Sequence, residues 1–501
     1  MCASAEENDV SDRERPNLLY ILSDQHNPSV TGCYGDPLVQ TPNLDALAAS
    51  GMVFDNAYCT APLCAPSRMS MLAGQHPHQI GVWTNQHILD SAIPTFAHAL
   101  GAVGYHPTLI GRMHSVGSDQ LHGYAERLVG DLGSHYAGVG GRFDRGALTS
   151  TVHPKRASLE LSGSGQSGYQ VYDEYVTAET INYLNRLGLQ KKYGHATDPF
   201  CLSVGLLLPH PPYVALREDY DLYRGRMTMP KCPGSFSEDL HPFMRWWWQQ
   251  AGIAEAEATD EEIIRARTAY WALVTRMDKM IGRIISALHA NDLADNTMIV
   301  YMSDHGDQLG EHGFWWKHTF YEGSVRIPAM ISWPGVVTAG QRCSHVVSSL
   351  DVMATMLDAL EAPTLPHSNG RSLLDLIRSP DKDVAWTDEA FSESCTDDGW
   401  YARMIRKDKW KLNYYHGYEP QLFDLETDPT ESRDLARDAA SGSILRELED
   451  RVLLGWDPER IAHTMATKRE DAQVTTAWAQ SVKPQDYIRW DLKPDQYYLD
   501  E

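Results

Sequence analysis

The stretch Tyr58-Cys59-Thr60-Ala61-Pro62-Leu63-Cys64-Ala65-Pro66-Ser67-Arg68 places a cysteine between two prolines, just before a run that favours helix. The prolines predict an irregular segment around Cys64 and a helix that starts near Ser67. A side chain at such a loop-to-helix junction faces unpaired backbone N–H groups, which favour an anion. Cys64 is therefore a candidate nucleophile in an anion-binding site, although an isolated cysteine is also often an ordinary buried thiol.

The composition limits which classes of protein this chain can belong to. The chain has 501 residues, of which 43% are hydrophobic and 22% charged, so it can bury a large core. Its formal charge of −24 opposes binding to nucleic acid or to an anionic membrane, both of which attract basic surfaces. We therefore expect neither as a partner, and we expect a local cluster of positive groups if the substrate is an anion.

Cysteine usage and the N-terminal stretch bear on the compartment. The eight cysteines show no paired spacing, and a chain of this length does not depend on disulfides. Residues 1–9 are acidic where a secretory signal is basic and then apolar, and no apolar run approaches about 18 residues. We therefore expect reduced thiols and a cytoplasmic location.

The pattern Cys64-x-Pro66-Ser67-Arg68, followed by Gly74 and His76-Pro77, resembles the signature of type I sulfatases in the alkaline phosphatase superfamily. In that family the cysteine is oxidised after synthesis to formylglycine. The resemblance thus implies this conversion at Cys64 by a formylglycine-generating enzyme. An aldehyde hydrate carries two hydroxyls on one carbon, one to attack sulfur and one to expel sulfate. A plain thiolate could not perform the second step.

Three continuous apolar runs of strand length, 17–22, 200–208 and 297–302, end in polar residues. Ligands of parallel sheets bind beyond the carboxyl ends of the strands, so the following side chains are expected at one site. These side chains are Asp24, Gln25, His210, Asp304 and His305. Each alone has an ordinary alternative, such as a turn aspartate or a surface histidine.

The family resemblance assigns a metal site to part of this set. It implies that Asp24, Asp304, His305 and an oxygen of the modified Cys64 bind one divalent cation, with Gln25 beside it. Ligation rich in oxygen suits Ca²⁺, whereas the imidazole admits Mn²⁺, and both ions stay open.

The resemblance also implies roles in binding a small anionic ester. Gly111-Arg112-Met113-His114 stands where sulfatases commonly show Gly-Lys-Trp-His, so an arginine replaces the lysine. His114 would take the proton from the geminal hydroxyl, and Arg68 would orient the nucleophile. The residues implied to hold the sulfate are Asn85, Arg112, His210 and Lys317.

The implied fold is an α/β/α sandwich around a mixed, mostly parallel sheet, with a smaller C-terminal subdomain built on an antiparallel sheet. We divide the chain into a leader (1–14), a catalytic domain (15–382), a C-terminal subdomain (383–480) with a closing helix, and a tail (481–501). The aromatic, acidic tail suits an arm on a neighbouring subunit, hence a homo-oligomer.

Other segments predict local features. Residues 138–170 have loop composition and suit a lid over the site. Thr259 to Glu262 form a capping box that opens a long amphipathic helix through Leu288. The run Trp246-Trp247-Trp248 suits either a pocket wall or a subunit contact.

The predicted activity is hydrolysis of a sulfate monoester. Residues 117–128 resemble choline sulfatases, but the likeness fades after Asp131. A choline cage would need aromatic and acidic residues such as Trp246–Trp248 and Asp397–Tyr401, and the sequence cannot place these around one cavity. The alternatives are a phosphonate monoester or phosphodiester hydrolase with the same nucleophile, and a non-catalytic anion-binding protein on the same fold.

Overall fold

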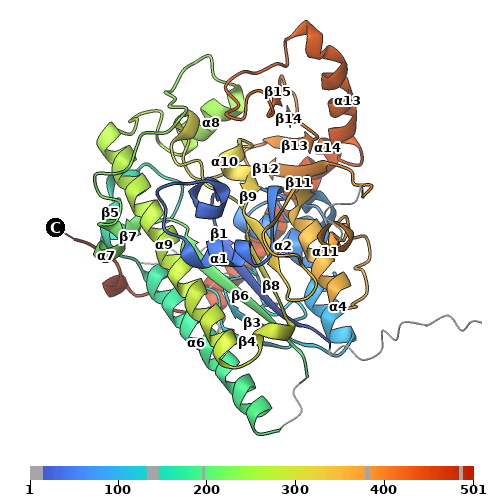
Figure 1. Ribbon diagram of the computed structural model, residues 1–501. Helices are drawn as coiled ribbons and strands as arrows, with labels where there is room; N and C mark the ends of the chain where they lie inside the picture. The colour runs from blue at the N-terminus through green and yellow to red at the C-terminus, as the bar shows by residue number, and fades with distance from the viewer. Residues whose placement is uncertain (1–14, 133–145, 195–197, 379–383, 485–488, 501) are drawn as a thin grey trace, which may run out of the picture.

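A large mixed sheet forms the centre of the protein. The computed structural model describes residues 15–132, 146–194, 198–378, 384–484 and 489–500 (Figure 1). The main sheet has nine strands in the order β11-β2-β10-β8-β1-β6-β3-β4, with β9 beside β2. Its strands are β1 Asn17–Asp24, β2 Met52–Tyr58, β3 His106–Gly111, β4 Glu126–Val129, β6 Phe200–Pro209, β8 Thr297–Ser303, β9 Arg326–Ile327, β10 Ala329–Ser332 and β11 Gln341–Ser348.

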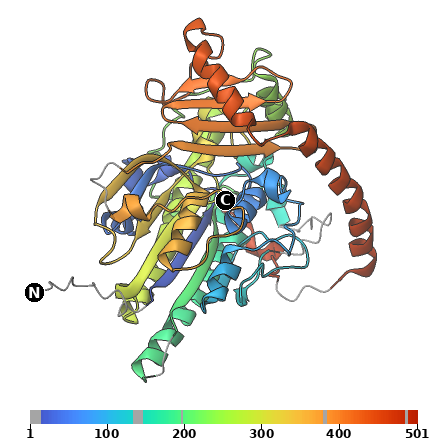
Figure 2. The same cartoon turned by 90° about the vertical axis from the view of Figure 1, so that its right-hand side faces the viewer.

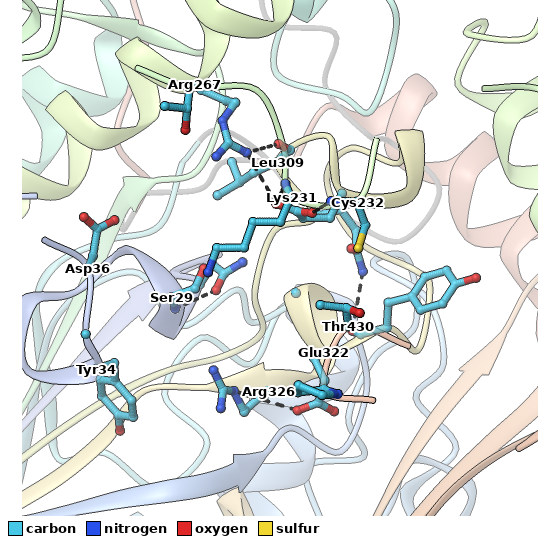
Figure 3. Close-up of a pocket in the computed structure, with 18 of the residues that line it drawn as sticks. Ser29, Tyr34, Asp36, Lys231, Cys232, Arg267, Leu309, Glu322, Arg326 and Thr430 are labelled. Atoms are coloured by element: carbon cyan, nitrogen blue, oxygen red, sulfur yellow. Dashed lines mark hydrogen bonds and ion pairs between the residues drawn. The ribbon is translucent and has the colours of Figure 1, made fainter. Parts of the chain in front are cut away.

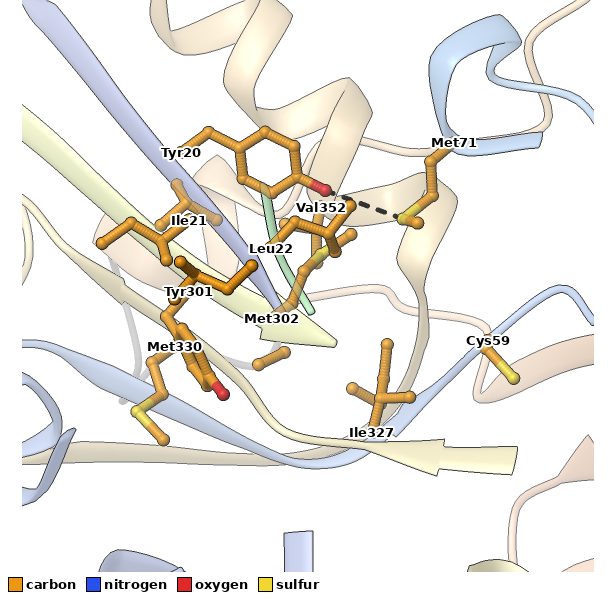
Figure 4. Packing of buried hydrophobic residues seen from close by; sticks show 14 of the residues in the cluster. Tyr20, Ile21, Leu22, Cys59, Met71, Tyr301, Met302, Ile327, Met330 and Val352 are labelled. Atoms are coloured by element: carbon orange, nitrogen blue, oxygen red, sulfur yellow. Dashed lines mark hydrogen bonds between the residues drawn. The ribbon is translucent and has the colours of Figure 1, made fainter. Parts of the chain in front are cut away.

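The centre of the sheet is parallel and buried on both faces. Strand β1 lies between β6 and β8, and Leu19 pairs with Leu202 on one side and Ile299 on the other. Figure 4 shows Tyr20 and its neighbours in β1 packed among the side chains of β8. Burial on both faces explains why these strands are continuous apolar runs, as the sequence predicted.

Helices cover both faces of the sheet (Figure 1). The long helices α6 Gly168–Lys192 and α9 Asp260–Ala290 pack together on one face, and α1 Pro42–Ala49 lies against α9. Helices α2 Cys64–Ala73, α4 Phe96–Ala102 and α11 Ser349–Ala359 pack on the other. The capping box predicted at the start of α9 is confirmed, because Thr259 Oγ1 accepts from the N–H of Glu262.

A four-stranded antiparallel sheet forms the C-terminal subdomain, as predicted. Its strands are β12 Glu389–Cys395, β13 Tyr401–Lys407, β14 Trp410–Tyr415 and β15 Gln421–Asp424. Two helices follow where one was expected. Helix α13, Gly442–Leu453, covers the sheet, while α14, Pro458–Val482, runs from the subdomain back along the catalytic domain (Figure 2).

The remaining helices are short. They are α3 Pro77–Ile80, α5 Ala157–Glu160, α7 Arg217–Tyr220, α8 Pro242–Gln250, α10 Glu322–Val325 and α12 Leu374–Arg378.

The described part of the tail packs on its own chain. Strand β16, Tyr498–Leu499, pairs with β5, Gly163–Gln166, in a small sheet that also includes β7, Val214–Ala215. The ring of Trp490 lies 4.5 Å from that of Tyr175 between centroids. A contact of this tail with a neighbouring subunit stays a prediction.

The prediction that residues 138–170 form a loop is partly wrong. Residues 133–145 lie outside the described residues, but α5, β5 and the start of α6 fall in the remainder. Helix α6 begins in a polar sequence with a capping box, in which the backbone N–H of Ser167 donates to Gln170 Oε1 at 3.2 Å. Gln170 Nε2 in turn donates to the carbonyl of Val214 at 2.9 Å. This capping interaction replaces the apolar periodicity that would have revealed the helix start.

We predict that Gly205→Ala destabilises the protein, because an added Cβ on β6 would lie 1.8 Å from the carbonyl oxygen of Arg112. Backbone atoms cannot yield as a flexible side chain can, so a loss of about 1–3 kcal/mol or more is expected. Thermal unfolding measures the effect. The matched control is Gly101→Ala in α4, where the new Cβ meets no atom within 4 Å, and an unchanged unfolding temperature in Gly205→Ala would contradict the prediction.

Candidate active site

The carboxyl ends of β1, β6 and β8 meet the first turn of α2. Cys64 is the first residue of α2, so this helix begins at Cys64 rather than near Ser67. The expectation was wrong because Pro66 falls in the first turn, where the N–H that proline lacks has no helical partner. Cys64 nevertheless lies at the predicted loop-to-helix junction and is fully buried.

Four predicted metal ligands form one buried cluster. The potential ligand atoms of Asp24, Cys64, Asp304 and His305 all lie within 4.8 Å of one another. Cys64 Sγ is 3.5 Å from Asp24 Oδ1 and 3.2 Å from His305 Nε2. His305 Nδ1 donates to the carbonyl of Gly306 at 3.0 Å, which leaves the lone pair of Nε2 facing the cluster.

Arg68 links the two carboxylates of this cluster. It is buried, and its Nε donates to Asp304 Oδ2 at 2.7 Å while Nη2 donates to Asp24 Oδ2 at 3.3 Å. Burial alone would raise the pKa of Asp24, but Arg112, Arg68 and Lys317 outweigh it and hold that pKa well below its usual value. Arg68 thus holds the two carboxylates beside Cys64, and its role in orienting the nucleophile stays a prediction.

Lys317 points its ammonium at the nucleophile position. Its Nζ donates to Gln25 Oε1 at 2.9 Å, to Cys64 Sγ at 3.0 Å and to His210 Nε2 at 3.1 Å. These contacts use the three donors of an ammonium group. The structure therefore brings Gln25, His210 and Lys317 together around Sγ.

His210 differs from its expected role as a donor. Its Nδ1 donates to the carbonyl of Pro211 at 2.7 Å, so Nε2 is the acceptor of the bond from Lys317. Burial, with the charge of Lys317, holds the pKa of His210 well below its usual value. The neutral ring therefore fixes Lys317 in this arrangement.

Arg112 connects the cluster to His114. Its Nε donates to Asp24 Oδ2 at 2.6 Å, Nη1 to Asp131 Oδ1 at 3.2 Å, and Nη2 to His114 Nδ1 at 2.8 Å. Because a guanidinium only donates, Nδ1 of His114 must accept, and the neutral ring carries its hydrogen on Nε2. The role of His114 as a base in the reaction stays a prediction.

Asn85 supports the first turn of α2. Its Oδ1 accepts a hydrogen bond from the backbone N–H of Ala65 at 2.9 Å. This bond satisfies a helix N–H beside the nucleophile. A contact of Asn85 with a substrate oxygen stays a prediction.

Two buried aspartates of the site were missed. Asp131 accepts from Arg112, from Arg127 Nη2 at 3.3 Å and from the backbone N–H of His114. Asp307 accepts from Gln25 Nε2 at 2.6 Å and from the hydroxyl of Tyr213 at 2.7 Å. The position of Asp307, two residues after His305, was a usable signal, whereas nothing in the sequence tied Asp131 to its partners.

The Cys64 thiol is not set up as a thiolate. Burial, and then the charge of Asp24, raise its pKa to about 11, against the opposing charge of Lys317. A buried neutral thiol is a weak nucleophile. The seven described cysteines, Cys64 among them, are all free, as expected.

The tryptophan run lies inside this chain and beside the site. Trp247 packs on His318, the neighbour of Lys317, with 4.5 Å between ring centroids. Trp246 lies 5.9 Å from Trp400 of the C-terminal subdomain, and Trp248 is buried in the core. The two stretches considered for a leaving-group cage are therefore adjacent in space.

Known proteins resemble this chain along most of its length. Residues 16–362 match the sulfatase family, and residues 310–454 match the C-terminal region of N-sulphoglucosamine sulphohydrolase. A choline-sulfatase of Rhizobium meliloti is 33% identical over 96% of this chain and 94% of its own. Arylsulfatase K of Gallus gallus is 30% identical over 84% of this chain and 79% of its own. The crystal structure of a phosphonate monoester hydrolase of Agrobacterium radiobacter superposes with a TM-score of 0.73 at 22% identity, covering 88% of this chain and 95% of that one.

We predict a pH-dependent loss of stability in Asp131→Asn. Burial opposes ionisation of Asp131, but Arg112 and then Arg127 hold its pKa well below its usual value. Its stabilisation is therefore present above the unfolded pKa of about 4 and is lost as the pH falls through the folded value. The variant should lose about 3–5 kcal/mol near neutral pH, because two buried guanidinium groups lose their partner.

Thermal unfolding from pH 7 downward measures this prediction. The difference between the wild type and Asp131→Asn should shrink below about pH 4, as the wild-type carboxylate protonates. Asp398→Asn, at an exposed carboxylate, is the control. A difference that stays constant with pH would contradict the assignment of the effect to the charge of Asp131.

Proposed function

Because the chain belongs to the sulfatase family, we propose that it hydrolyses a sulfate monoester with formylglycine formed from Cys64 and one divalent cation. The observation that carries the proposal is the surroundings of Cys64 Sγ. Three groups lie within 3.5 Å of this atom: the carboxylate of Asp24, the imidazole of His305 and the ammonium of Lys317. The first two are of the kinds that bind metal ions. A cation, an anionic ester and a nucleophile can meet only at such a point.

The modification supplies what the thiol lacks. The aldehyde hydrate provides one hydroxyl for attack on sulfur and a second whose deprotonation expels sulfate. The raised pKa of the Cys64 thiol supports this proposal over direct attack by a thiolate.

The donor set fits a hard divalent cation. Asp24 and Asp304 offer carboxylate oxygens, and His305 offers Nε2, since its Nδ1 is committed to Gly306. Such an ion polarises substrate oxygens and acidifies a hydroxyl beside it. Oxygen ligands favour Ca²⁺, and the imidazole admits Mn²⁺.

The side chains around the cluster supply the charge for the sulfate group. Lys317 donates at the position of the nucleophile, and Arg112 borders the same cluster through Asp24. Negative charge moves to the leaving oxygen in the transition state, where fixed donors stabilise it most. We assign His114 to this task through its Nε2–H, with His210 holding Lys317 in place.

The leaving group is proposed to lie along the aromatic residues Trp246, Trp247 and Trp400. These rings adjoin Lys317 through His318, and Asp397 and Asp398 precede Trp400. Aromatic faces with nearby acids suit either an aryl group or a quaternary ammonium. Both classes agree with the names of the relatives, a choline-sulfatase and arylsulfatases.

A phosphonate monoester or phosphodiester hydrolase is the second candidate. The pairs Asp24-Gln25 and Asp304-His305 also resemble those of phosphonate monoester hydrolases, and Gln25 Oε1 accepts a hydrogen bond from Lys317 at 2.9 Å. A non-catalytic anion-binding protein is the third candidate, and the assembled ligand set argues against it.

Maturation by a formylglycine-generating enzyme, a homo-oligomeric state and a cytoplasmic location remain proposals. Among the described residues, no helix is both long and apolar enough to cross a bilayer.

We predict that the wild type hydrolyses an aryl sulfate faster than the matched phenyl phosphonate monoester, and that Cys64→Ala abolishes both activities. The peptide with residue 64 should be lighter than the cysteine form by about 18 Da, as oxidation of a thiol to an aldehyde requires. Steady-state rates and mass spectrometry of the same preparation, made beside a formylglycine-generating enzyme, measure both results.

Three outcomes decide between the candidates. A faster rate on the phosphonate would favour the second candidate, and no turnover by the modified protein would favour the third. An unmodified thiol in fully active enzyme would overturn the proposed nucleophile. Ser70→Ala, in α2 but outside the cluster, controls for damage to the helix.

We also predict that removal of divalent cations abolishes turnover, because Asp24, Asp304 and His305 would lose the ion that acidifies the nucleophile. Dialysis against a chelator, followed by addition of Ca²⁺ or Mn²⁺ singly, identifies the ion by the rate restored. Full activity of the metal-free enzyme would refute a catalytic metal.

A further inference from the structure

A second cavity lies next to the loop that follows β8, between the catalytic domain and the C-terminal subdomain (Figure 3). Its volume is about 690 Å³, within the usual range for small-molecule sites. Asn27 and Leu309 border it on one side and the turn 429–431 on another. None of its lining residues, all of which the structure describes, belongs to the set assembled around Cys64.

The carboxylates of this cavity are already committed to the protein. Asp36 accepts from two backbone N–H groups and from the indole of Trp271. Glu311 accepts from the backbone of Lys231 and Cys232. Glu322 and Glu431 both pair with the buried ammonium of Lys411, at 2.9 and 2.7 Å. The acids are therefore structural and do not by themselves provide a site for a cation.

Two arginines that line the cavity each have a buried N–H donor without a hydrogen-bond partner among the described residues. Arg267 is only 7% exposed, yet its buried Nε has no hydrogen-bond partner among the described residues. Arg326 lies 3.8 Å from Glu322, beyond hydrogen-bond distance, and its Nε is likewise buried without a partner among the residues described. Arg267 Nη1 likewise lies 3.8 Å from Glu311, so neither guanidinium donates a hydrogen bond to a carboxylate of the described residues. An anion in the cavity would supply such an acceptor.

Lys231 adds a third cation from the rim. Figure 3 shows its side chain extended across the cavity toward Ser29, with Arg267 and Arg326 on opposite sides. Its Nζ makes no hydrogen bond or ion pair with any described residue, while its backbone N–H donates to Glu311 Oε1 at 3.0 Å. Cations from three separate segments thus face one space.

Apolar and aromatic side chains form part of the wall. Tyr34, Leu38, Met227 and Trp271 line it, and Arg267 lies over the Trp271 ring at 4.9 Å. A volume of this size exceeds that of an inorganic anion alone. The lining therefore matches a molecule with an anionic end and an apolar body.

We propose that this cavity binds a small organic anion, with its oxyanion at Arg267, Lys231 and Arg326 and its apolar body against Trp271. The site is separate from the one around Cys64, and the proposal does not depend on the proposed activity. The shared chemistry is that of a sulfonate, sulfate, phosphate or carboxylate on an organic body.

Isothermal titration with naphthalene-1-sulfonate tests the proposal on the full chain. The neutral naphthalene-1-methanol should bind at least about tenfold more weakly, because it offers no charge to the guanidinium groups. Competition by naphthalene-1-carboxylate, naphthyl phosphate, inorganic sulfate and inorganic phosphate separates the possible anions. Competition by the organic anions but not by the inorganic ones is expected.

Variants locate the binding. Lys231→Ala and Arg326→Gln, both at accessible side chains, should weaken the sulfonate by about tenfold and leave turnover unchanged. Arg267→Gln should weaken it more, and its unfolding temperature shows whether the fold survives. Lys192→Ala, an exposed lysine at the end of α6, and Cys64→Ala should bind as the wild type does.

Two results would overturn the proposal. One is equal affinity for the sulfonate and the alcohol, which would mean that only apolar surface is recognised. The other is loss of binding in Cys64→Ala with full binding in Lys231→Ala, which would place the probe at the reaction site.

Discussion

The site depends on one buried arrangement, the guanidinium of Arg68 between the carboxylates of Asp24 and Asp304. Asp24 ends β1 and Asp304 follows the neighbouring parallel strand β8, so the sheet brings two like charges together in the buried interior. Arg68, on the first turn of α2, offsets that repulsion with a hydrogen bond to each. The same helix carries Cys64, so the pairing of Arg68 with the two carboxylates also places Cys64 beside them.

A network of hydrogen bonds and ion pairs surrounds Arg68 and its two carboxylates. Arg112 joins Asp24 to Asp131, and Lys317 joins Cys64 to Gln25, which in turn bonds to Asp307. Buried charges are costly unless they are paired, and here Arg68 and Arg112 pair with Asp24, Asp304 and Asp131, whereas Lys317 donates to neutral groups. A divalent cation and a singly charged anionic ester together would add one unit of positive charge to the site. The network can therefore accept both without a large electrostatic cost.

The loop after β8 contributes residues to both the site around Cys64 and the second cavity. Leu309 donates its N–H to Asp307, which belongs to the reaction site, and its carbonyl accepts from Arg267 in the second cavity at 2.7 Å. The C-terminal subdomain likewise contributes to both, with Trp400 near the aromatic wall and the turn 429–431 at the cavity. The small subdomain thus lies beside both spaces.

The sequence alone determined the fold class, the strand ends and the family, because apolar runs that stop at Asp24, His210 and Asp304 and the motif at Cys64 are local features. Tertiary structure decided the roles. His114 became a donor only because Arg112 bonds to its Nδ1, and His210 became an acceptor because Pro211 and Lys317 take its two nitrogens. Asp131 gained its place from contacts with Arg112 and Arg127, which no spacing reveals. A hydrogen-bond role depends on which groups meet in space, and the order of residues does not specify that.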